Sequence, residues 1–510
     1  MSTPASWPSD VNIMDVISDW LRTRRWFPAS FEDTLEPIDL IDLSGAGVPP
    51  GADPSAPVDP CWITLVRAGT TLLQVPCVYT ATAPRGGQGV IDKVQDAWLV
   101  DGTMHPTFIR AWMRMASTSG SLARGLGSAP VGGVPAAGPS RAMGATKPAD
   151  PELLDALLAG AEDMRPLGVE QSNTSVLVPM GNGESALLKV IRILHAGENP
   201  DVEIPLALRA QGWEHVPEVI GHVELPLGRT PGSEAQEPAG WACSGVLTRF
   251  VPDAEDGFDL MVGMASRDED PTDVAAELGR VTGQMHAGLA TAFGLSDHAS
   301  GDDLADRIEV SLQAAAAEVP ELDDHLVGSL LARVADLRKL GELEARIRVH
   351  GDYHLGQTLR SDGTWYVLDF EGEPLRALEE RRAPDLAMRD VAGMMRSFDY
   401  AGAQATHDAV AAMDNRLTAV STAEMATLNP EGTEAEAGAP SSIDHSEWVH
   451  SARDAFIDGY TEGHGLDDRQ RATLLALEID KAVYEVVYEH RLRPSWMHIP
   501  LDALRRIAGV

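Results

Sequence analysis

The spacing of apolar and polar residues divides the chain into a mixed first part and a mostly helical last part. Apolar residues from Val16 to Leu21 recur at helical spacing. The runs CWITLV at 61–66 and TLLQVPCVY at 71–79 are rich in β-branched and aromatic residues, as strands are. The N-terminal region is therefore predicted to be α+β.

A second small sheet is predicted after residue 150. The run 151–164, PELLDALLAGAEDM, has helical spacing. The strand-like runs at 175–180 and 185–192 enclose a polar, glycine-containing turn, MGNGES, which indicates a hairpin. This part of the chain is predicted to form a sheet-bearing lobe.

From about Asp253 onward the pattern is helical, through 273–294, 325–347 and the last hundred residues. A single hairpin, GQTLRSDGTWYVLDFEG at 356–372, interrupts the helices. The pattern thus predicts a small sheet-bearing lobe followed by a larger helical lobe.

Four stretches rich in Gly, Pro, Ala and Ser have no apolar periodicity and are predicted to be breaks: 45–60, 118–150, 226–240 and 429–442. The longest exceeds the usual loop of a compact domain, so it is predicted to be a linker or an insertion. The predicted boundaries are 1–117 for the N-terminal region, 118–150 for the linker, 151–252 for the small lobe and 253–510 for the helical lobe. The stretch 429–442 is expected to be a loop without chemistry.

Composition then narrows the class of protein. The 510 residues carry 77 Asp and Glu against 40 Lys and Arg, a formal charge of −37, which repels phosphate backbones and anionic lipid surfaces. We therefore expect no nucleic-acid partner and no membrane partner. Three distant cysteines argue against a zinc site and a disulfide framework, and no export signal or apolar span is evident. These features predict a cytoplasmic protein.

The chemistry is concentrated around the hairpin of the helical lobe. His350, Gly351 and Asp352 are followed by His354 and Gln357, and a strand-like run ends in Asp369 and Glu371, beginning 17 residues after Asp352. Phosphoryl transfer needs a carboxylate that orients and deprotonates the acceptor hydroxyl, and oxygen ligands that hold magnesium on the nucleotide phosphates. This spacing supplies both.

These residues resemble the H-G-D-x-H-x-x-N plus D-x-E/D signature of kinases of the aminoglycoside-phosphotransferase type, with Gln357 in the place of the Asn. The run LDFEGEP at 368–374, the run 380–401 and EIDKAVYEVVYEHRLRPSWMHIPL at 478–501 resemble bacterial maltokinases more closely. The segment 20–27, which contains RRWF, is similar to the opening of that family's N-terminal cap. Actinobacterial glucosamine kinases share much of the same core. The resemblance implies an α+β, two-lobed, protein-kinase-like fold with an N-terminal cap.

The resemblance also implies roles for single residues. Asp352 corresponds to the catalytic base, Gln357 and Asp369 to magnesium ligands, and Glu371 to a helper at the metal. Lys189 corresponds to the lysine that grips the phosphates, and Glu203 to its helix partner. The phosphate-covering loop falls on Gln171, Ser172, Asn173, Thr174 and Ser175, although these residues contain no G-x-G-x-x-G.

The acceptor sugar is predicted to bind a helical face near the C-terminus. Asp480, Tyr484, Tyr488 and Arg491 follow one another at offsets of four, four and three, so they share one face of a helix. Aromatic faces and bidentate polar groups are the groups that bind sugars. Further predicted sugar-site residues are Glu489 and Trp496 near this face, and His354, Arg389 and Asp390 near the base.

The resemblance therefore implies an ATP- and Mg²⁺-dependent kinase that converts maltose to maltose 1-phosphate, a precursor of α-1,4-glucan such as glycogen. It also suggests a trehalose isomerase as a partner. Two alternatives stay open. The first is a kinase for an amino sugar such as glucosamine, or for an aminoglycoside, which the acidity of the chain favours because a cationic acceptor would be attracted. The second is a regulatory pseudokinase, which the intact acidic residues argue against.

Overall fold

The computed structural model describes residues 7–27, 34–48, 51, 58–84, 87–117, 122–123, 140–141, 151–167, 173–181, 183–227, 240–373, 378–425 and 445–510. The chain forms two compact units. Unit 1 comprises Met1–Leu206 and Pro217–Pro252, and unit 2 comprises Ala207–Val216 and Asp253–Val510. Each is described by itself.

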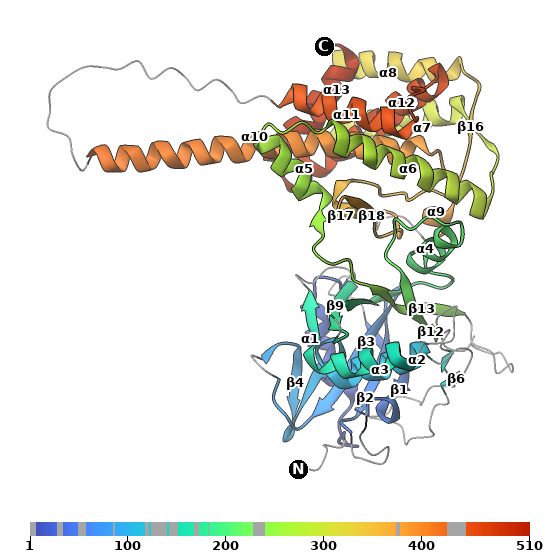
Figure 1. The fold of residues 1–510 in the computed structure, drawn as a ribbon, viewed down its shortest axis with the longest axis vertical. Helices are drawn as coiled ribbons and strands as arrows, with labels where there is room; N and C mark the ends of the chain where they lie inside the picture. The colour runs from blue at the N-terminus through green and yellow to red at the C-terminus, as the bar shows by residue number, and fades with distance from the viewer. Residues whose placement is uncertain are drawn as a thin grey trace. The chain divides into compact units, whose positions relative to one another are not determined.

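Unit 1 is built on two antiparallel sheets (Figure 1). The first sheet has the order β1-β2-β3-β5-β4, and β11 pairs with β3; the second has the order β12-β13-β10-β9-β8. The strands are β1 (Leu35–Asp42), β2 (Cys61–Ala68), β3 (Thr71–Thr80), β4 (Val90–Val94), β5 (Ala97–Asp101), β8 (Arg165–Leu167), β9 (Asn173–Pro179), β10 (Ser185–Ile191), β11 (Ile193–Leu194), β12 (Val219–Pro226) and β13 (Trp241–Arg249). The helices are α1 (Ile13–Arg22), α2 (Pro106–Ser117), α3 (Pro151–Gly160) and α4 (Pro200–Ala210), and α4 ends in unit 2.

The predicted local elements of unit 1 are confirmed. The helix α1 begins after Asn12, whose side chain accepts from the Met14 N–H, and it buries Ile13, Ile17 and Leu21 on one face. The two strand-like runs at 61–66 and 71–79 lie in β2 and β3. The predicted hairpin is β9 paired with β10, with alternate residues of β10 buried.

One core joins the regions predicted as the N-terminal cap and the small lobe. A single buried cluster contains Val78 and Phe108 from the first region and Val176 and Leu188 from the second. The side-chain amide of Gln74 in β3, fully buried, donates to the Ser244 carbonyl of β13 at 2.6 Å and to the Ile191 carbonyl. The cap sheet is thus bonded to the second sheet within unit 1.

One short strand pair completes the description of unit 1. Strands β6 (Leu122–Ala123) and β7 (Ser140–Arg141) pair within the predicted linker. The rest of 118–150 and all of 429–442 lie outside the described residues.

Unit 2 is mostly helical (Figure 1). Its helices are α5 (Gly257–Ser266), α6 (Thr272–Phe293), α7 (Gly301–Glu318), α8 (Asp324–Arg338), α9 (Leu378–Arg382), α10 (Met388–Met425), α11 (Ser446–Tyr460), α12 (Asp468–Leu492) and α13 (His498–Ala508). Short strands form two small sheets: β14 (Glu255–Asp256) with β17 (Thr358–Ser361) and β18 (Thr364–Val367), and β15 (His298–Ser300) with β16 (Glu342–Ala345). The C-terminal part of α10 extends away from the other helices of this unit.

The predicted hairpin of this lobe is confirmed as β17–β18. The predicted helix over 325–347 is wrong at its end. The helix α8 ends at Arg338, Gly341 adopts a left-handed conformation with φ of 68°, and residues 342–345 pair with β15 instead. Among the described helices, none combines the length and the apolar character that a membrane crossing needs.

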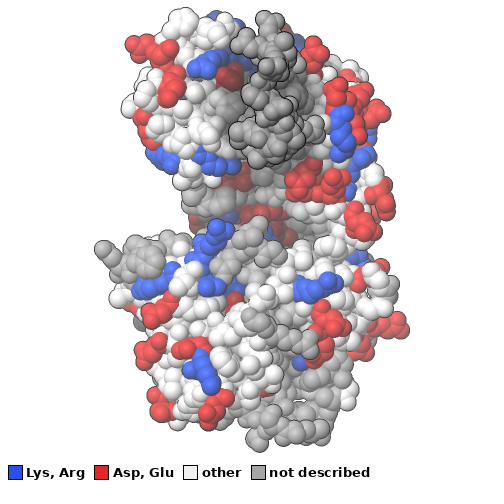
Figure 2. Space-filling model, turned by 90° about the vertical axis from the view of Figure 1, so that its left-hand side faces the viewer, with Lys and Arg blue, Asp and Glu red and all other residues white. Residues whose placement is uncertain are grey.

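On the face shown in Figure 2, acidic and basic side chains lie interspersed on both units. Such mixing is typical of a solvated surface.

Close packing of α6 on α11 depends on two glycines. A Cβ at Gly459 would lie 1.9 Å from the Ala276 carbonyl oxygen, and a Cβ at Gly279 would lie 2.0 Å from that of Phe456. Both contacts involve backbone, so a side chain at either position must push the helices apart.

We therefore predict that Gly459→Ala lowers the free energy of unfolding by about 1–3 kcal/mol, measured by urea titration of the full chain. The matched control is Gly328→Ala in α8, where an added Cβ meets nothing within 4 Å. That change should leave stability unchanged or raise it by up to about 1 kcal/mol, because alanine favours a helix. Equal effects at the two positions would contradict the packing argument.

Candidate active site

The loop that carries Asp352 is fixed by buried hydrogen bonds. The backbone N–H groups of His350 and Gly351 each donate to the carboxylate of Asp390 at 2.9 Å. The His350 ring donates from Nε2 to the Leu368 carbonyl at 2.8 Å, which leaves Nδ1 to accept from the Asp352 N–H at 3.4 Å. The backbone that leads into Asp352 is therefore fixed by hydrogen bonds at three successive N–H groups.

Asp390 was predicted to bind the sugar, and the structure corrects this. Its carboxylate is buried, at 1% exposure, and it also bonds His286 Nε2 at 3.0 Å. Burial raises the pKa of Asp390, but the hydrogen bond and charge of His286 lower it, and the net direction is downward. Asp390 therefore positions the loop and has no face toward an acceptor.

The β17–β18 hairpin brings the two predicted magnesium ligands to the same end. Gln357 immediately precedes β17 and its carbonyl accepts from the Leu368 N–H at 2.9 Å, next to Asp369. Asp369 has a left-handed backbone with φ of 57°, which is uncommon for a residue other than glycine and is often found at functional sites. The carbonyl of Glu371 accepts from Arg381 at 2.9 Å.

In unit 1, the predicted phosphate-gripping lysine lies beside α4. Lys189 Nζ lies 2.5 Å from the carboxylate of Asp201, in the first turn of that helix. Lys189 thus pairs with Asp201, two positions before Glu203, the partner that was predicted. The role of Glu203 stays a prediction.

The register of β9 against β10 separates the residues of the predicted phosphate loop. Ser175 lies opposite Lys189, and Asn173 lies opposite Ile191, so Asn173, Ser175 and Lys189 share one face of the sheet. Thr174 lies on the other face, where its hydroxyl accepts from Arg192 Nε at 2.9 Å. The side chain of Thr174 thus lies on the face opposite to Lys189, because neighbouring strand residues point to opposite faces, and its contact with the nucleotide stays a prediction. Gln171 and Ser172 lie outside the described residues.

Asp352 opens onto a cavity of about 370 Å³ within unit 2. Four other predicted residues line it: Arg389, Asp480, Tyr484 and Arg491. The sequence analysis missed several lining residues, which are Arg307, Ser311, Glu318, Glu373 and Lys481. The helix α12 supplies one wall and α7 supplies another.

Among the described residues, four predicted sugar ligands besides Asp390 do not line this cavity: His354, Tyr488, Glu489 and Trp496. Glu489 is buried at 1% exposure and binds Arg493 at 2.6 Å. The Trp496 ring lies tilted against the His407 ring, with the ring centres 5.6 Å apart, and Tyr488 stacks on Tyr484 with the ring centres 6.3 Å apart. Burial lowers the pKa of His354.

Some of the lining residues that the sequence analysis missed could have been found from the sequence, and others could not. Lys481 follows Asp480 directly in the quoted motif, and Glu373 follows Glu371 by two residues. Both could have been found by treating every charged residue of those motifs as a candidate. Arg307 and Glu318 come from α7, where the sequence offers no motif, and only packing brings them to the cavity.

Comparisons with known proteins identify the family. A model of the phosphotransferase enzyme family matches residues 163–372. A glucosamine kinase from Streptacidiphilus jiangxiensis is 30% identical over 356 residues, covering 65% of this chain and 70% of that protein. The chain belongs to the phosphotransferase enzyme family.

A glucosamine kinase from Mycolicibacterium smegmatis is 29% identical over 381 residues, covering 71% of this phosphotransferase and 84% of that protein. Among solved structures, a glucosamine kinase has a TM-score of 0.60 at 21% identity and covers 98% of this chain and 100% of its own. This likeness confirms the predicted α+β, kinase-like fold. The comparisons support the predicted kinase superfamily and not the narrower resemblance to maltokinases.

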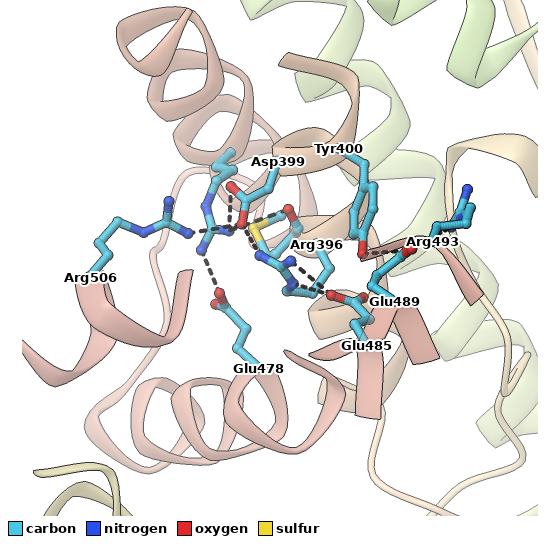
Figure 3. A network of polar contacts seen from close by, with 10 residues as sticks. Arg396, Asp399, Tyr400, Glu478, Glu485, Glu489, Arg493 and Arg506 are labelled. Carbon is cyan, nitrogen blue, oxygen red and sulfur yellow. Dashed lines mark hydrogen bonds and ion pairs between the residues drawn. The ribbon is translucent and has the colours of Figure 1, made fainter. Parts of the chain in front are cut away.

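Unit 2 of this phosphotransferase also holds a largely buried network of charged side chains (Figure 3). Arg396, at 1% exposure, binds Glu485 of α12 at 2.8 Å and also pairs with Asp399. Asp399 further binds Arg453 at 3.3 Å and Arg506 at 2.9 Å, and Arg453 binds Glu478 at 2.7 Å. Three arginines thus face three carboxylates, which ties α10, α11, α12 and α13 together.

We predict that Asp390→Asn lowers both turnover and stability at neutral pH, because an amide is a weaker acceptor for two buried N–H groups. The expected loss in the free energy of unfolding is about 1–3 kcal/mol at pH 7. The folded-state pKa of Asp390 lies below its unfolded value, so its contribution is present above about pH 4 and is lost as the pH falls through the folded value.

The stability difference between wild type and Asp390→Asn should therefore shrink below about pH 4, measured by urea unfolding between pH 3 and pH 7. Asp454→Asn, an exposed carboxylate of α11, is the control and should show no such dependence. A difference that stays constant with pH would argue against the ionised role of Asp390.

Proposed function

We propose that this phosphotransferase is an ATP-dependent kinase for an amino sugar, with glucosamine as the favoured acceptor. The observation that carries the proposal is the cavity on Asp352, whose walls combine carboxylates, cations and the ring of Tyr484. Polar groups around an aromatic face suit a small polyhydroxy molecule. The names of the relatives support the same acceptor class, and one solved relative of the same fold was determined with glucosamine, ADP and inorganic phosphate.

In this proposal Asp352 orients an acceptor hydroxyl and takes its proton as the oxygen attacks the γ-phosphorus of ATP. Lys189, held by Asp201, places an ammonium against phosphate oxygens. Gln357 and Asp369 fit Mg²⁺, because amide and carboxylate oxygens are the ligands that this ion prefers. Bound there, Mg²⁺ would offset negative charge on the phosphates. Glu371 stays a predicted helper.

The charges of the cavity favour an ammonium-bearing acceptor. Glu318 is bound at 2.7 Å by Arg491, and Glu373 lies 3.0 Å from Lys481. Asp480 instead forms a long ion pair with Arg307, at 3.8 Å. Asp480 is therefore the lining carboxylate best placed to accept the amino group of a sugar.

Maltose is the second candidate. Tyr484 lines the cavity with Tyr488 stacked beside it, and an aromatic pair of this kind suits the apolar face of a disaccharide. Phosphorylation of maltose to maltose 1-phosphate for glycogen synthesis, and partnership with a trehalose isomerase, remain proposals that depend on this candidate. An uncharged disaccharide would gain less binding free energy from Asp480 than an ammonium-bearing sugar, because it cannot form an ion pair with the carboxylate.

The first test is release of ADP from Mg²⁺-ATP with glucosamine, glucose, maltose and an aminoglycoside, with the product identified by NMR. Turnover with glucosamine supports the proposal, preference for maltose replaces it with the second candidate, and no turnover with any acceptor favours a pseudokinase.

We predict that Asp352→Asn lowers turnover on the active acceptor by a hundredfold or more, because an amide cannot take the proton, a loss of roughly the size expected for a general base. The matched control is Asp362→Asn at the tip of the β17–β18 hairpin, whose left-handed backbone an asparagine tolerates. The control should keep wild-type turnover. Wild-type turnover in Asp352→Asn would show that Asp352 is not the general base.

We also predict that Asp480→Asn raises the KM for glucosamine by roughly 10- to 100-fold and leaves that for glucose nearly unchanged, because a charge-assisted hydrogen bond to the amino group is lost. Asp468→Asn, at the start of the same helix with its side chain 96% exposed, is the control. A parallel rise for both sugars would show that Asp480 does not recognise the amine.

A further inference from the structure

Lys481 is the cationic residue that pairs with the proposed base, Asp352. Its Nζ lies 3.8 Å from Asp352 Oδ1 and 3.0 Å from Glu373 Oε1, and it lies 5.5 Å from the centre of the Tyr484 ring. The side chain is 27% exposed and lines the cavity. Lys481 comes from α12, so 129 positions of sequence separate it from Asp352.

An ammonium at this point has a clear electrostatic consequence. Asp352 and Glu373 are two carboxylates within reach of one amine, and without it they would repel each other in a partly buried space. Burial lowers the pKa of Lys481, but Glu373, Asp352 and Glu485 raise it, and the net direction is upward. The amine therefore stays charged and holds both carboxylates.

Among the described ion pairs, the other cations of the cavity bind carboxylates other than Asp352. Arg491 binds Glu318 with two nitrogens at 2.7 Å, and Arg389 binds Asp385 at 3.1 Å and, at the longer distance of 3.7 Å, Glu373. Among the ion pairs of the described residues, the pair with Lys481 is the one formed by Asp352. The lysine is thus the group that can fix the direction of the base.

We propose that Lys481 is a positioning residue, which holds the carboxylate of Asp352 toward the acceptor hydroxyl by bridging it to Glu373. This inference rests on the proposed kinase function. It differs from a binding role for Lys481, because the effect passes through Asp352 and not through a contact with the sugar.

The buried charge network keeps Lys481 in place. Glu485 lies one helical turn after Lys481 on α12, and Arg396 of α10 binds it with two nitrogens at 2.8 Å (Figure 3). A buried arginine that binds one carboxylate with two nitrogens restricts rotation of α12 about its axis. The ion pair between Arg396 and Glu485 therefore helps the packing of α12 to keep Lys481 directed into the cavity.

The test compares Lys481→Met with the control Lys339→Met, which removes the same charge from a side chain that is 77% exposed and directly follows α8. Turnover and acceptor affinity are measured separately, the second by calorimetry without ATP. Lys481→Met should lower kcat about a hundredfold, because a small misplacement of a reacting group has that effect, and should leave the acceptor Kd within threefold. The control should match wild type in both.

Two results would overturn the inference. One is wild-type kcat in Lys481→Met, and the other is a Kd weakened tenfold with kcat retained, which would make Lys481 an acceptor ligand. If wild type turns over no acceptor in the panel, the proposed function fails instead, and the two failures are thereby distinguished.

A double variant separates positioning from folding. Lys481→Met removes the cation closest to Glu373, and an unneutralised, partly buried carboxylate destabilises unit 2. The double variant therefore combines Lys481→Met with Glu373→Gln. The double variant should regain the wild-type Tm and keep the low kcat. Recovery of kcat along with Tm would show that Lys481 serves only to neutralise Glu373, and would contradict a role through Asp352.

Discussion

The shape of the loop that carries Asp352 depends on one buried carboxylate. Asp390 accepts from the backbone of both His350 and Gly351 and pairs with His286, so it fixes the two residues before Asp352. The His350 ring then joins the loop to the end of the β17–β18 hairpin through Leu368. A loop without this acceptor would leave two buried N–H groups without partners, a cost of about 1–3 kcal/mol for each group. Asp390 therefore fixes the loop that carries Asp352, and through His350 this loop is bonded to the hairpin.

Paired charge is the second constraint on unit 2. The chain has a large excess of acidic residues, yet the buried carboxylates Asp399, Glu478 and Glu485 are paired with Arg396 and Arg453, and the exposed Arg506 also binds Asp399 from the surface (Figure 3). Removing one member of such a network leaves an uncompensated buried charge, which is far more destabilising than the loss of a surface ion pair. The cavity at Asp352 continues this arrangement, because each of its cations lies beside a carboxylate.

These two constraints meet at α12. One side of this helix carries Glu478 and Glu485 into the buried network, and another presents Asp480, Lys481 and Tyr484 to the cavity. A helix makes this possible because its side chains project around the whole circumference, so different sides of α12 can pack against different elements. The helix thus links the stability of the lobe to the chemistry of the site.

The sequence by itself determined the local elements and the identity of the chemical groups. Apolar spacing predicted α1, the β9–β10 hairpin and the β17–β18 hairpin, and the motif spacing predicted Asp352 with Gln357 and Asp369, because these depend on residues close together in the chain. The tertiary structure decided which charged residues face one another. Asp390 and Glu489 were predicted sugar ligands but are buried and bonded elsewhere, whereas Lys481 and Glu318 reach the cavity from separate helices. Helical spacing gives the face of a residue but not the element packed against that face, and contacts between distant segments are set only when the core is assembled.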